Sequence, residues 1–332
     1  MVKALLERVL GQETREGWLV VELNGKTVRL AHVHRDGARP AVEFAERRAW
    51  EPSDPKTLER IAREFGAGRF QCITLLPRTE YQMLLVDVPA VPAEEVKPAL
   101  RWRIKDMLEF PVDEATVDML ELPVPQDAPR ARQMYAVAAR QQAVKATAER
   151  FVKAGMNLSV IDIPDTAHRN LAGLFETEGR GVAVLTVGEE GGLITVTFKS
   201  ELYVSRHLDL TVQQLSTAGG SGQAAGSGAL TLDTGDVQAP LFERILVEMQ
   251  RTLDHCERLY PFFSIGRVVV GPLPDEVGLR EHLAANLYLP VETMDLARVM
   301  RLPRSASAWA PAERSRFLRL IGAGLRIEAK VH

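Results

Sequence analysis

The stretch WLVVELNGKTVRLAHV (residues 18–33) places two apolar runs on either side of an Asn-Gly-Lys turn. Alternation of apolar and polar residues through both runs is the pattern of two half-buried β-strands. The dipeptide Asn24-Gly25 suits a type I′ hairpin turn, because both central residues of that turn need positive φ. Another strand near residues 40–45 completes a meander of three strands.

The same arrangement returns in the second half of the chain. Residues 181–210, GVAVLTVGEEGGLITVTFKSELYVSRHLDL, read as three successive strands with a glycine-rich first turn. Strands alternate with amphipathic helices after each meander, which predicts an α/β protein of two lobes with a cleft between them. We place the lobes at residues 1–178 and 179–332, with a flexible Gly/Ser/Ala loop at 218–228.

The helices are predicted from apolar periodicity and from their end signals. Asp54, Pro55 and Gly66 bracket a helix as its N-cap, first turn and C-terminal stop. A second helix spans residues 92–111, with acidic residues at its start and Pro111 at its end. The remaining predicted helices cover residues 141–155, 165–176, 242–261 and 311–326, with a short one after residue 277.

Composition argues against several classes of function. Of the 332 residues 46% are hydrophobic and 26% charged, and the net charge is −3, so there is no basic field for nucleic acid. Two distant cysteines, Cys72 and Cys256, argue against a disulfide framework and favour a reducing compartment. No window reaches the ~18 apolar residues of a membrane span, and residues 1–18 lack the apolar core of a signal peptide. We therefore expect a cytoplasmic protein whose membrane association runs through a partner.

Three stretches resemble a known family. Residues 75–123, LLPRTEYQMLLVDVPAVPAEEVKPALRWRIKDMLEFPVDEATVDMLELP, are similar to the segment that characterises the actin-like assembly proteins of type IV pili. VEMQRTLDHCERLYP (247–261) and RLIGAGLR (319–326) resemble the same family, which includes PilM and the MSHA agglutinin-pilus protein MshI. The resemblance implies the actin-like ATPase (ribonuclease H-like) two-lobed fold, with a small α+β subdomain inserted in the first lobe at about residues 77–158.

The resemblance also implies a place of action and a partner. Members of the family act as scaffolds at the cytoplasmic face of the inner membrane. They dock the cytoplasmic tail of a PilN-like bitopic membrane protein. The related secretion protein GspL carries its own transmembrane helix, which this sequence lacks, so association through a partner is expected. A homo-dimer is a further option, and no nucleic-acid partner is implied.

The resemblance implies that the first hairpin forms half of a nucleotide-binding site. The family pattern is similar to Asp-x-Gly-x-x-x-x-Lys, and the same places here hold Glu22, Asn24 and Arg29. Glu22 keeps the charge on a longer side chain, and Asn24 adds a side chain where glycine leaves room. Gly25 and Lys26 follow Asn24 in the Asn-Gly-Lys segment between the two strands. Taken by itself, the stretch is better explained as an ordinary hairpin, and only the resemblance makes it a candidate site.

The second half of the implied nucleotide site departs further from the pattern. Its Asp-x-Gly becomes Thr186-Val187-Gly188, which loses a carboxylate that would position magnesium. A Gly-Gly turn becomes Gly271-Pro272, and proline has no N–H to donate. We expect a vestigial nucleotide cleft with no or weak ATP/Mg²⁺ binding and no catalysis, lined by Glu22, Asn24, Gly25, Lys26, Arg29, Thr186, Gly188 and Gly271.

An active ATPase or a small-molecule kinase of the same fold is the alternative. In that case Glu22, together with Glu189 or Glu190, would hold the metal, although a charged solvated turn is the favoured interpretation of Glu189-Glu190. No nucleophile-elbow, Walker, HExxH or CxxC pattern is present, so other hydrolase classes have no support.

The predicted helix at 92–111 offers a candidate partner surface. Val96, Leu100, Ile104, Met107 and Leu108 follow helical spacing and are expected in the core. Trp102 and Phe110 fall off this stripe and are flanked by cations, which is typical of an interface anchor. The expected partner-binding residues are Arg101, Trp102, Lys105 and Phe110. Addition of the partner's tail to a strand edge is the other mode, which leaves little side-chain signature.

Two other groups have a simpler interpretation. His32 and His34 share one face of a strand, but without an evident third ligand they are expected to be surface histidines and not a metal site. His255 and Cys256 are neighbours on a helix and point in different directions, so packing is the expected role.

Overall fold

The computed structural model describes residues 15–36, 39–125, 132–219, 235–273, 278–309 and 311–327. The chain divides into two compact units, Met1–Ala167 with Ala323–His332, and His168–Gly322. The first unit thus ends at Ala167, where the sequence suggested 178, and the last segment belongs to the first unit. The boundary between the two units lies inside a helix, where no turn residues mark it in the sequence. The expected flexible loop lies outside the described residues except for 218 and 219, which end a helix.

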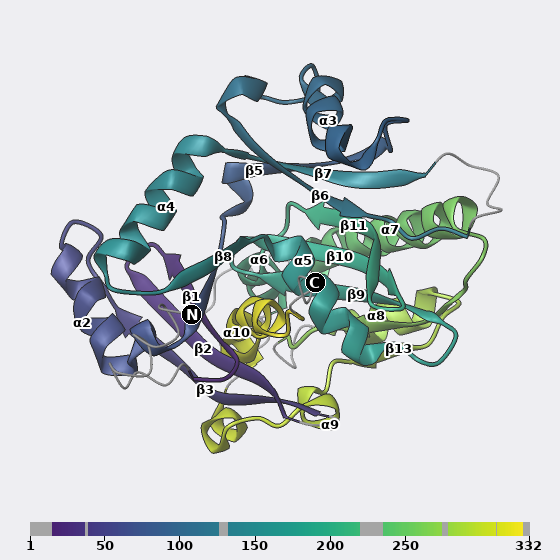
Figure 1. Cartoon of the computed structure of the whole chain (residues 1–332). Helices are drawn as coiled ribbons and strands as arrows, with labels where there is room; N and C mark the ends of the chain where they lie inside the picture. Colours follow the sequence, from purple (N-terminus) through teal and green to yellow (C-terminus); the bar gives the residue numbers. More distant parts are fainter. Residues whose placement is uncertain are drawn as a thin grey trace. The chain divides into compact units, whose positions relative to one another are not determined.

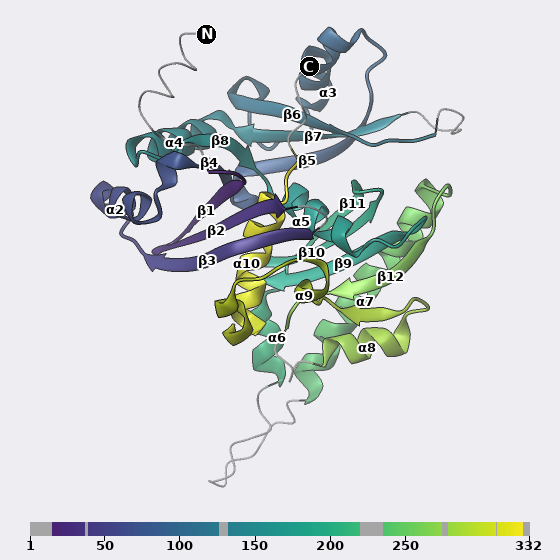
Figure 2. The same ribbon diagram turned by 60° about the horizontal axis from the view of Figure 1, so that its bottom comes forward.

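The first unit is built on a five-stranded sheet in the order β3-β2-β1-β4-β8, of which Figure 1 labels β1, β2, β3 and β8. The first three strands form the predicted antiparallel meander, and β1, β4 and β8 run parallel. Figure 2 shows β3, β2 and β1 side by side. The elements are β1 (Trp18–Asn24), β2 (Thr27–Asp36), β3 (Arg39–Ala49), α2 (Pro55–Phe65), β4 (Gln71–Leu75), α4 (Gln141–Lys153) and β8 (Leu158–Asp162).

The core of this sheet is closed by α2 and α4. Leu19 of β1, Leu30 of β2, Ile61 of α2 and Phe151 of α4 are buried in one hydrophobic cluster. The ends of α2 follow the sequence signals: the Asp54 side chain accepts a hydrogen bond from Lys56 N, and the left-handed C-cap is glycine.

The first hairpin turn differs from the predicted type. The strand register pairs Asn24 with Thr27, so the two turn residues are Gly25 and Lys26. Only Gly25 has positive φ (54°), which is the sign pattern of a type II′ turn with glycine in the first central position. The predicted type I′ turn at Asn24-Gly25 is therefore wrong in type, and the observed turn lies one residue later in the chain.

A three-stranded sheet is inserted between β4 and α4, as the family resemblance implied. Its strands lie in the order β5-β7-β6 and are all antiparallel. They are β5 (Tyr81–Asp87), β6 (Ala115–Glu121) and β7 (Gln133–Arg140), with α3 (Val96–Ile104) packed on one face through Leu100 and Ile104. The inserted part ends near Arg140 and not at 158, because α4 already contributes Phe151 to the first sheet's core.

The second unit repeats the architecture with its own five-stranded sheet, in the order β11-β10-β9-β12-β13. β9, β10 and β11 are an antiparallel meander, and β9, β12 and β13 are parallel. The strands are β9 (Gly181–Gly188), β10 (Gly191–Phe198), β11 (Glu201–Leu208), β12 (Ile265–Val270) and β13 (Val291–Thr293). The prediction of an α/β fold in which one topology occurs twice is confirmed.

The helices after the insertion are α5 (Pro164–Ala172), α6 (Val212–Gly219), α7 (Gly235–Leu259), α8 (Leu279–Asn286), α9 (Leu296–Val299) and α10 (Pro311–Gly324). α5 and α10 each contain a point where the chain passes from one unit to the other. Within the described part of the chain, no helix combines the length and the apolar character needed to cross a bilayer.

The end of α10 lies against the first sheet with almost no space. A Cβ atom at Gly324 would stand 2.6 Å from Val33 Cβ and 2.7 Å from Val33 Cγ2, so only glycine fits there. The next residues are held by hydrogen bonds: Arg35 Nη2 donates to Leu325 O at 2.9 Å, and Trp18 Nε1 donates to Arg326 O at 3.3 Å. Gly324 therefore allows α10 to pack closely against β2.

Candidate functional site

Glu22 and Arg29 face each other across the first hairpin and form a buried ion pair. The register sets them directly opposite on β1 and β2. Arg29 Nη1 donates to Glu22 Oε2 at 2.9 Å, and the two side chains are only 6% and 7% exposed. A buried carboxylate gains strongly from an adjacent guanidinium, because leaving either charge alone away from water costs several kcal/mol. The residues predicted to hold magnesium and phosphate are thus each other's partners.

The turn of this hairpin is fastened to the segment before α2. Trp50 Nε1 donates to Gly25 O at 3.0 Å, and Trp50 N donates to Lys26 O at 3.0 Å. Lys26 Nζ lies 3.0 Å from Glu51 Oε2 on the surface. Burial of Trp50 therefore supports the turn, while the Lys26 ammonium remains largely in solvent.

The second hairpin, β9–β10, places Thr186 in a buried polar chain. Thr186 Oγ1 lies 3.0 Å from His168 Nε2, and His168 Nδ1 lies 2.7 Å from Thr195 Oγ1. His168 and Thr195 are buried. A neutral imidazole has one donor and one acceptor, and hydroxyls can supply either role, so both hydrogen bonds form in either tautomer. The Thr186 hydroxyl, at the position where the resemblance implied a carboxylate, is thus engaged inside the second unit.

The turn of the second hairpin is held by α10. Glu189 Oε1 lies 2.8 Å from Arg316 Nε, and Glu190 Oε2 lies 2.7 Å from Arg319 Nη1. The Ser315 hydroxyl also donates to the backbone oxygen of the strand before the turn, at 2.9 Å. A metal at either glutamate would compete with an arginine already in place.

Gly271 lies beside Thr186, as the nucleotide interpretation required. Gly271 N donates to Leu185 O at 2.7 Å, which continues the parallel pairing of β12 with β9. A Cβ at Gly271 would be 3.0 Å from Thr186 Cγ2, so the backbone approaches this side chain closely. Thr186 and Gly271, two of the residues predicted to line the nucleotide cleft, therefore lie next to each other in the second unit.

The residues present do not fit a tightly held magnesium nucleotide. Magnesium prefers carboxylate and water oxygens, and a threonine hydroxyl is a weak substitute. Glu22 keeps its carboxylate, but Arg29 already neutralises it in a site closed to water. Among the described residues, no group of three or more His, Cys, Asp or Glu side chains is placed to hold a metal.

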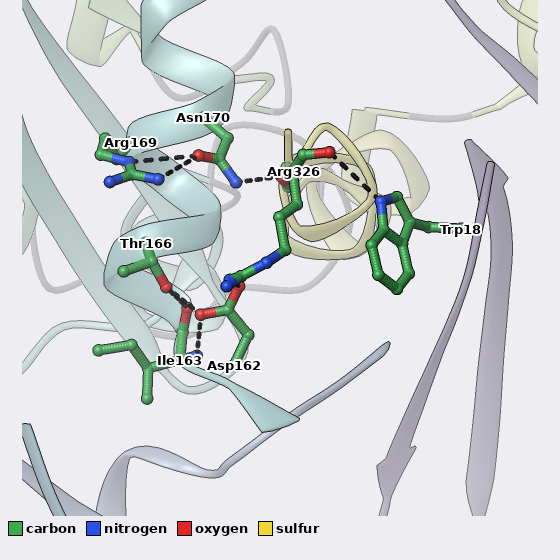
Figure 3. A network of polar contacts seen from close by, with 8 residues as sticks. Trp18, Asp162, Ile163, Thr166, Arg169, Asn170 and Arg326 are labelled. Carbon is green, nitrogen blue, oxygen red and sulfur yellow. Dashed lines mark hydrogen bonds and ion pairs between the residues drawn. The ribbon is translucent and has the colours of Figure 1, made fainter. Parts of the chain in front are cut away.

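The end of β8 carries a buried acidic group that the sequence reasoning missed (Figure 3). Asp162 Oδ1 accepts hydrogen bonds from Ile163 N at 2.9 Å and from Thr166 Oγ1, and its Oδ2 lies 3.3 Å from Arg326 Nη1. Asp165, which is fully buried, accepts from a tyrosine hydroxyl of the inserted sheet. The available signal was an acidic pair flanking Pro164 at a helix start.

A separate polar contact joins α5 to α10 inside the second unit (Figure 3). Asn170 Nδ2 donates to Gly322 O at 3.1 Å. Arg169 orients the amide by donating through Nε and Nη2 to Asn170 Oδ1 at 3.2 and 3.0 Å. α5 and α10 are therefore joined by a hydrogen bond within the second unit.

The predicted partner surface on α3 is smaller than expected. Phe110 is 7% exposed and packs in the core under α3, so it is a core residue and not an anchor. Arg101 Nη1 and Nη2 donate to Ala115 O and Val112 O at 2.8 and 2.6 Å. Because its guanidinium ties α3 to the loop before β6, Arg101 has a structural role.

Trp102 and Lys105 remain on the outer face of α3. The Trp102 side chain is 73% exposed, which makes it the most exposed large apolar residue in the described part of the chain. Lys105 Nζ lies 4.2 Å from the ring centroid, a cation–π distance. An exposed tryptophan held by a lysine is a typical interface anchor.

The two histidines of β2 have different surroundings. His32 is buried, with its ring 4.7 Å from that of Phe70 and its Nε2 2.9 Å from Glu16 O. Burial lowers the pKa of His32 below its ordinary value. His34 Nε2 lies 2.7 Å from Glu43 Oε1 on the surface. The expectation of surface histidines is therefore wrong for His32.

The cysteines are buried packing residues. Burial raises the pKa of Cys72 and of Cys256 to about 12 in each case. Cys256 is 1% exposed on α7, which confirms the packing role expected from its place beside His255. Neither thiol has the low pKa or the access that a nucleophile needs.

Comparison with solved structures identifies the fold. No protein-family model and no curated protein matches the sequence. The chain is similar to a chain of a PilM-PilN type IV pilus biogenesis complex, with 20% identity, 94% of this chain and 98% of that chain covered, and a TM-score of 0.67. It is also similar to the cytoplasmic domain of EpsL, an inner-membrane component of the type II secretion system of Vibrio cholerae (13% identity, coverage 64% and 79%, TM-score 0.42). A Bacteroides thetaiotaomicron protein of actin-like ATPase fold and unknown function gives 9% identity, coverage of 87% and 93%, and a TM-score of 0.46.

The first of these likenesses extends over both units and the inserted sheet. At 20% identity it establishes the fold, which is the actin-like ATPase fold predicted from the sequence. The strand orders of the two five-stranded sheets agree with that assignment, since each is a meander continued by parallel strands.

Proposed function

We propose that this chain is a scaffold of a type IV pilus inner-membrane assembly platform, which docks the cytoplasmic tail of a PilN-like bitopic membrane protein. The observation that carries the proposal is the likeness to a chain of the PilM-PilN complex, which covers 94% of this chain and 98% of that one. A likeness over the whole length includes the inserted sheet with α3, the part whose sequence most resembles the family.

The scaffold works by binding and not by turnover. Phosphoryl transfer depends on positioning and on metal electrostatics, so a protein that performs it needs its metal-holding carboxylates free. Glu22 is neutralised by Arg29, and Thr186 is bonded to His168 instead of presenting a carboxylate. These contacts support a vestigial nucleotide cleft that binds ATP and magnesium weakly or not at all. They do not favour the active ATPase or kinase.

The outer face of α3 is the proposed anchor for the partner's tail. Trp102 and Lys105 are exposed there, whereas Arg101 and Phe110 are engaged internally. Truncation of an exposed aromatic anchor in an interface typically costs about 2 kcal/mol or more of binding free energy. Trp102→Ala is expected to weaken tail binding about thirtyfold. Unchanged affinity would assign the tail to a strand edge, such as β5 or β6, by backbone pairing.

The proposed location is the cytoplasmic face of the inner membrane, reached through the partner alone. Liposomes with the bitopic protein reconstituted in them are expected to carry the purified chain in a flotation assay, and empty liposomes are not. Flotation with empty liposomes would contradict recruitment through the partner. Affinity for tails from different pilus systems tests the finer assignment to an MshI-type agglutinin pilus, and light scattering tests the homo-dimer.

A further inference from the structure

The first unit has a pocket of about 250 Å³ between the start of α2 and the second half of α4. Its floor is apolar: Trp50, Leu58 and Ala154 line it and are all buried. Pro52 and Pro55 form the wall on the α2 side. α2 and α4 pack in the same hydrophobic cluster, so the walls of the pocket are fixed to each other.

The α4 wall is a single stripe of the helix. Ala146, Glu149, Arg150 and Lys153 line the pocket and follow the spacing of three and four residues that places side chains on one face. Alanine at 146 leaves the space that a larger side chain would fill. The charged members stand at the rim, since all three are exposed.

The rim has an excess of positive charge. Within the described part of the chain, neither Arg150 nor Lys153 forms an ion pair. The acids of the nearby loop are already used: Glu51 pairs with a lysine, and Asp54 caps α2. Glu149 is the one acidic side chain among the lining residues. Two cations beside an apolar floor are complementary to an apolar group flanked by carboxylates.

We propose that this pocket binds an acidic peptide segment of a protein partner, with one apolar side chain on Trp50 and Leu58 and its carboxylates at Arg150 and Lys153. Small-molecule and cofactor sites usually have about 300–1,000 Å³, whereas this volume suits a single leucine or phenylalanine side chain. The contact stands apart from the α3 surface and does not depend on tail docking. It gives the chain a second point of attachment.

Fluorescence anisotropy with labelled hexapeptides tests the proposal on the full chain at low salt. One set has Leu or Phe flanked by Asp and Glu, and the matched set has the same residues flanked by Lys. We expect saturable binding of the acidic set and none of the basic set. Arg150→Glu and Lys153→Glu should each weaken binding at least tenfold, and Ala146→Met, which fills the pocket, should weaken it with no change in charge.

Lys145→Glu is the matched control. Lys145 is exposed on the same helix and does not line the pocket, so its reversal changes the net charge equally and should leave binding within twofold. Circular dichroism confirms that each variant is folded. Equal binding of both peptide sets, absence of binding at millimolar peptide, or an equal loss in Lys145→Glu would overturn the proposal. An oligomer of the chain that Arg150→Glu dissociates would assign the pocket to a second copy and would also overturn it.

Discussion

Arg29→Met removes one partner of the buried ion pair in the first hairpin and leaves the other. At 2.9 Å the Coulomb attraction between Arg29 and Glu22 is about 6 kcal/mol at an effective dielectric constant near 20. Removal of water from both charges offsets much of this attraction, but the single substitution takes the guanidinium away from the buried Glu22 carboxylate. The expected loss in the free energy of unfolding of the first unit is about 3–5 kcal/mol.

A double substitution measures the interaction between Glu22 and Arg29 separately from the contacts that each residue makes with the rest of the unit. Glu22→Leu combined with Arg29→Met replaces both charges by apolar side chains of similar volume, which is neutral or stabilising in comparable buried pairs. We expect the double variant to recover most of the stability that either single variant loses. The exposed pair Lys97–Asp118, at 3.0 Å, is the control, and Lys97→Met should cost under about 1 kcal/mol.

Hydrogen exchange of the β1 and β2 amides in increasing urea reports on the first unit separately. A loss below about 1 kcal/mol in Arg29→Met, or a double variant that shows the sum of the single losses, would refute the reasoning. In either case the ion pair would contribute little to the stability of the first unit.

Three further predictions concern single residues. Gly324→Ala forces a Cβ to within 2.6 Å of Val33, so urea unfolding should show a loss of about 1–3 kcal/mol, and an unchanged midpoint would contradict the close packing. Burial lowers the pKa of His32, so the folded state resists protonation of this residue. The stability that is present above about pH 6.5 therefore falls as the pH drops toward the folded-state pKa. Unfolding curves from pH 5 to 7.5 measure this pH dependence, and His32→Phe should remove the contribution of His32 to it. Because their pKa is about 12 and they are buried, Cys72 and Cys256 should react with a disulfide reagent only on unfolding, and rapid labelling of the native chain at pH 8 would contradict their burial.

The sequence predicted the repeated meander because alternation around a glycine turn is a local signal. It predicted the wrong turn, since Asn24-Gly25 is favourable by itself, while the observed register places Gly25 and Lys26 in the turn and Glu22 opposite Arg29. A turn at Asn24-Gly25 would pair Glu22 with Thr27 instead of Arg29, so the directly opposed ion pair forms only with the observed turn.

The partner surface was overestimated for a related reason. Helical spacing was extended to residue 111, but α3 ends at Ile104 and the chain then turns, so Phe110 enters the core from a loop. Arg101 bonds to two backbone carbonyls, which no periodicity reveals. Trp102 kept its predicted exposure because it lies inside the helix proper.

The buried polar groups could not be predicted, because they join residues that are distant in the sequence. His168 meets Thr186 and Thr195 only once α5 lies beside the second sheet. Asp162 meets Arg326 across 164 residues of chain. The family resemblance implied that a carboxylate is missing at 186, but only the fold reveals that the Thr186 hydroxyl contacts His168.

A calorimetric titration of the purified chain with a synthetic peptide of the bitopic partner's cytoplasmic tail, in the absence and in the presence of Mg²⁺ and ATP, tests the scaffold account directly. The account predicts saturable tail binding below high micromolar concentration, with the same affinity in both conditions and no phosphate released. No tail binding in either condition, or binding that requires ATP and is accompanied by steady hydrolysis, would contradict it.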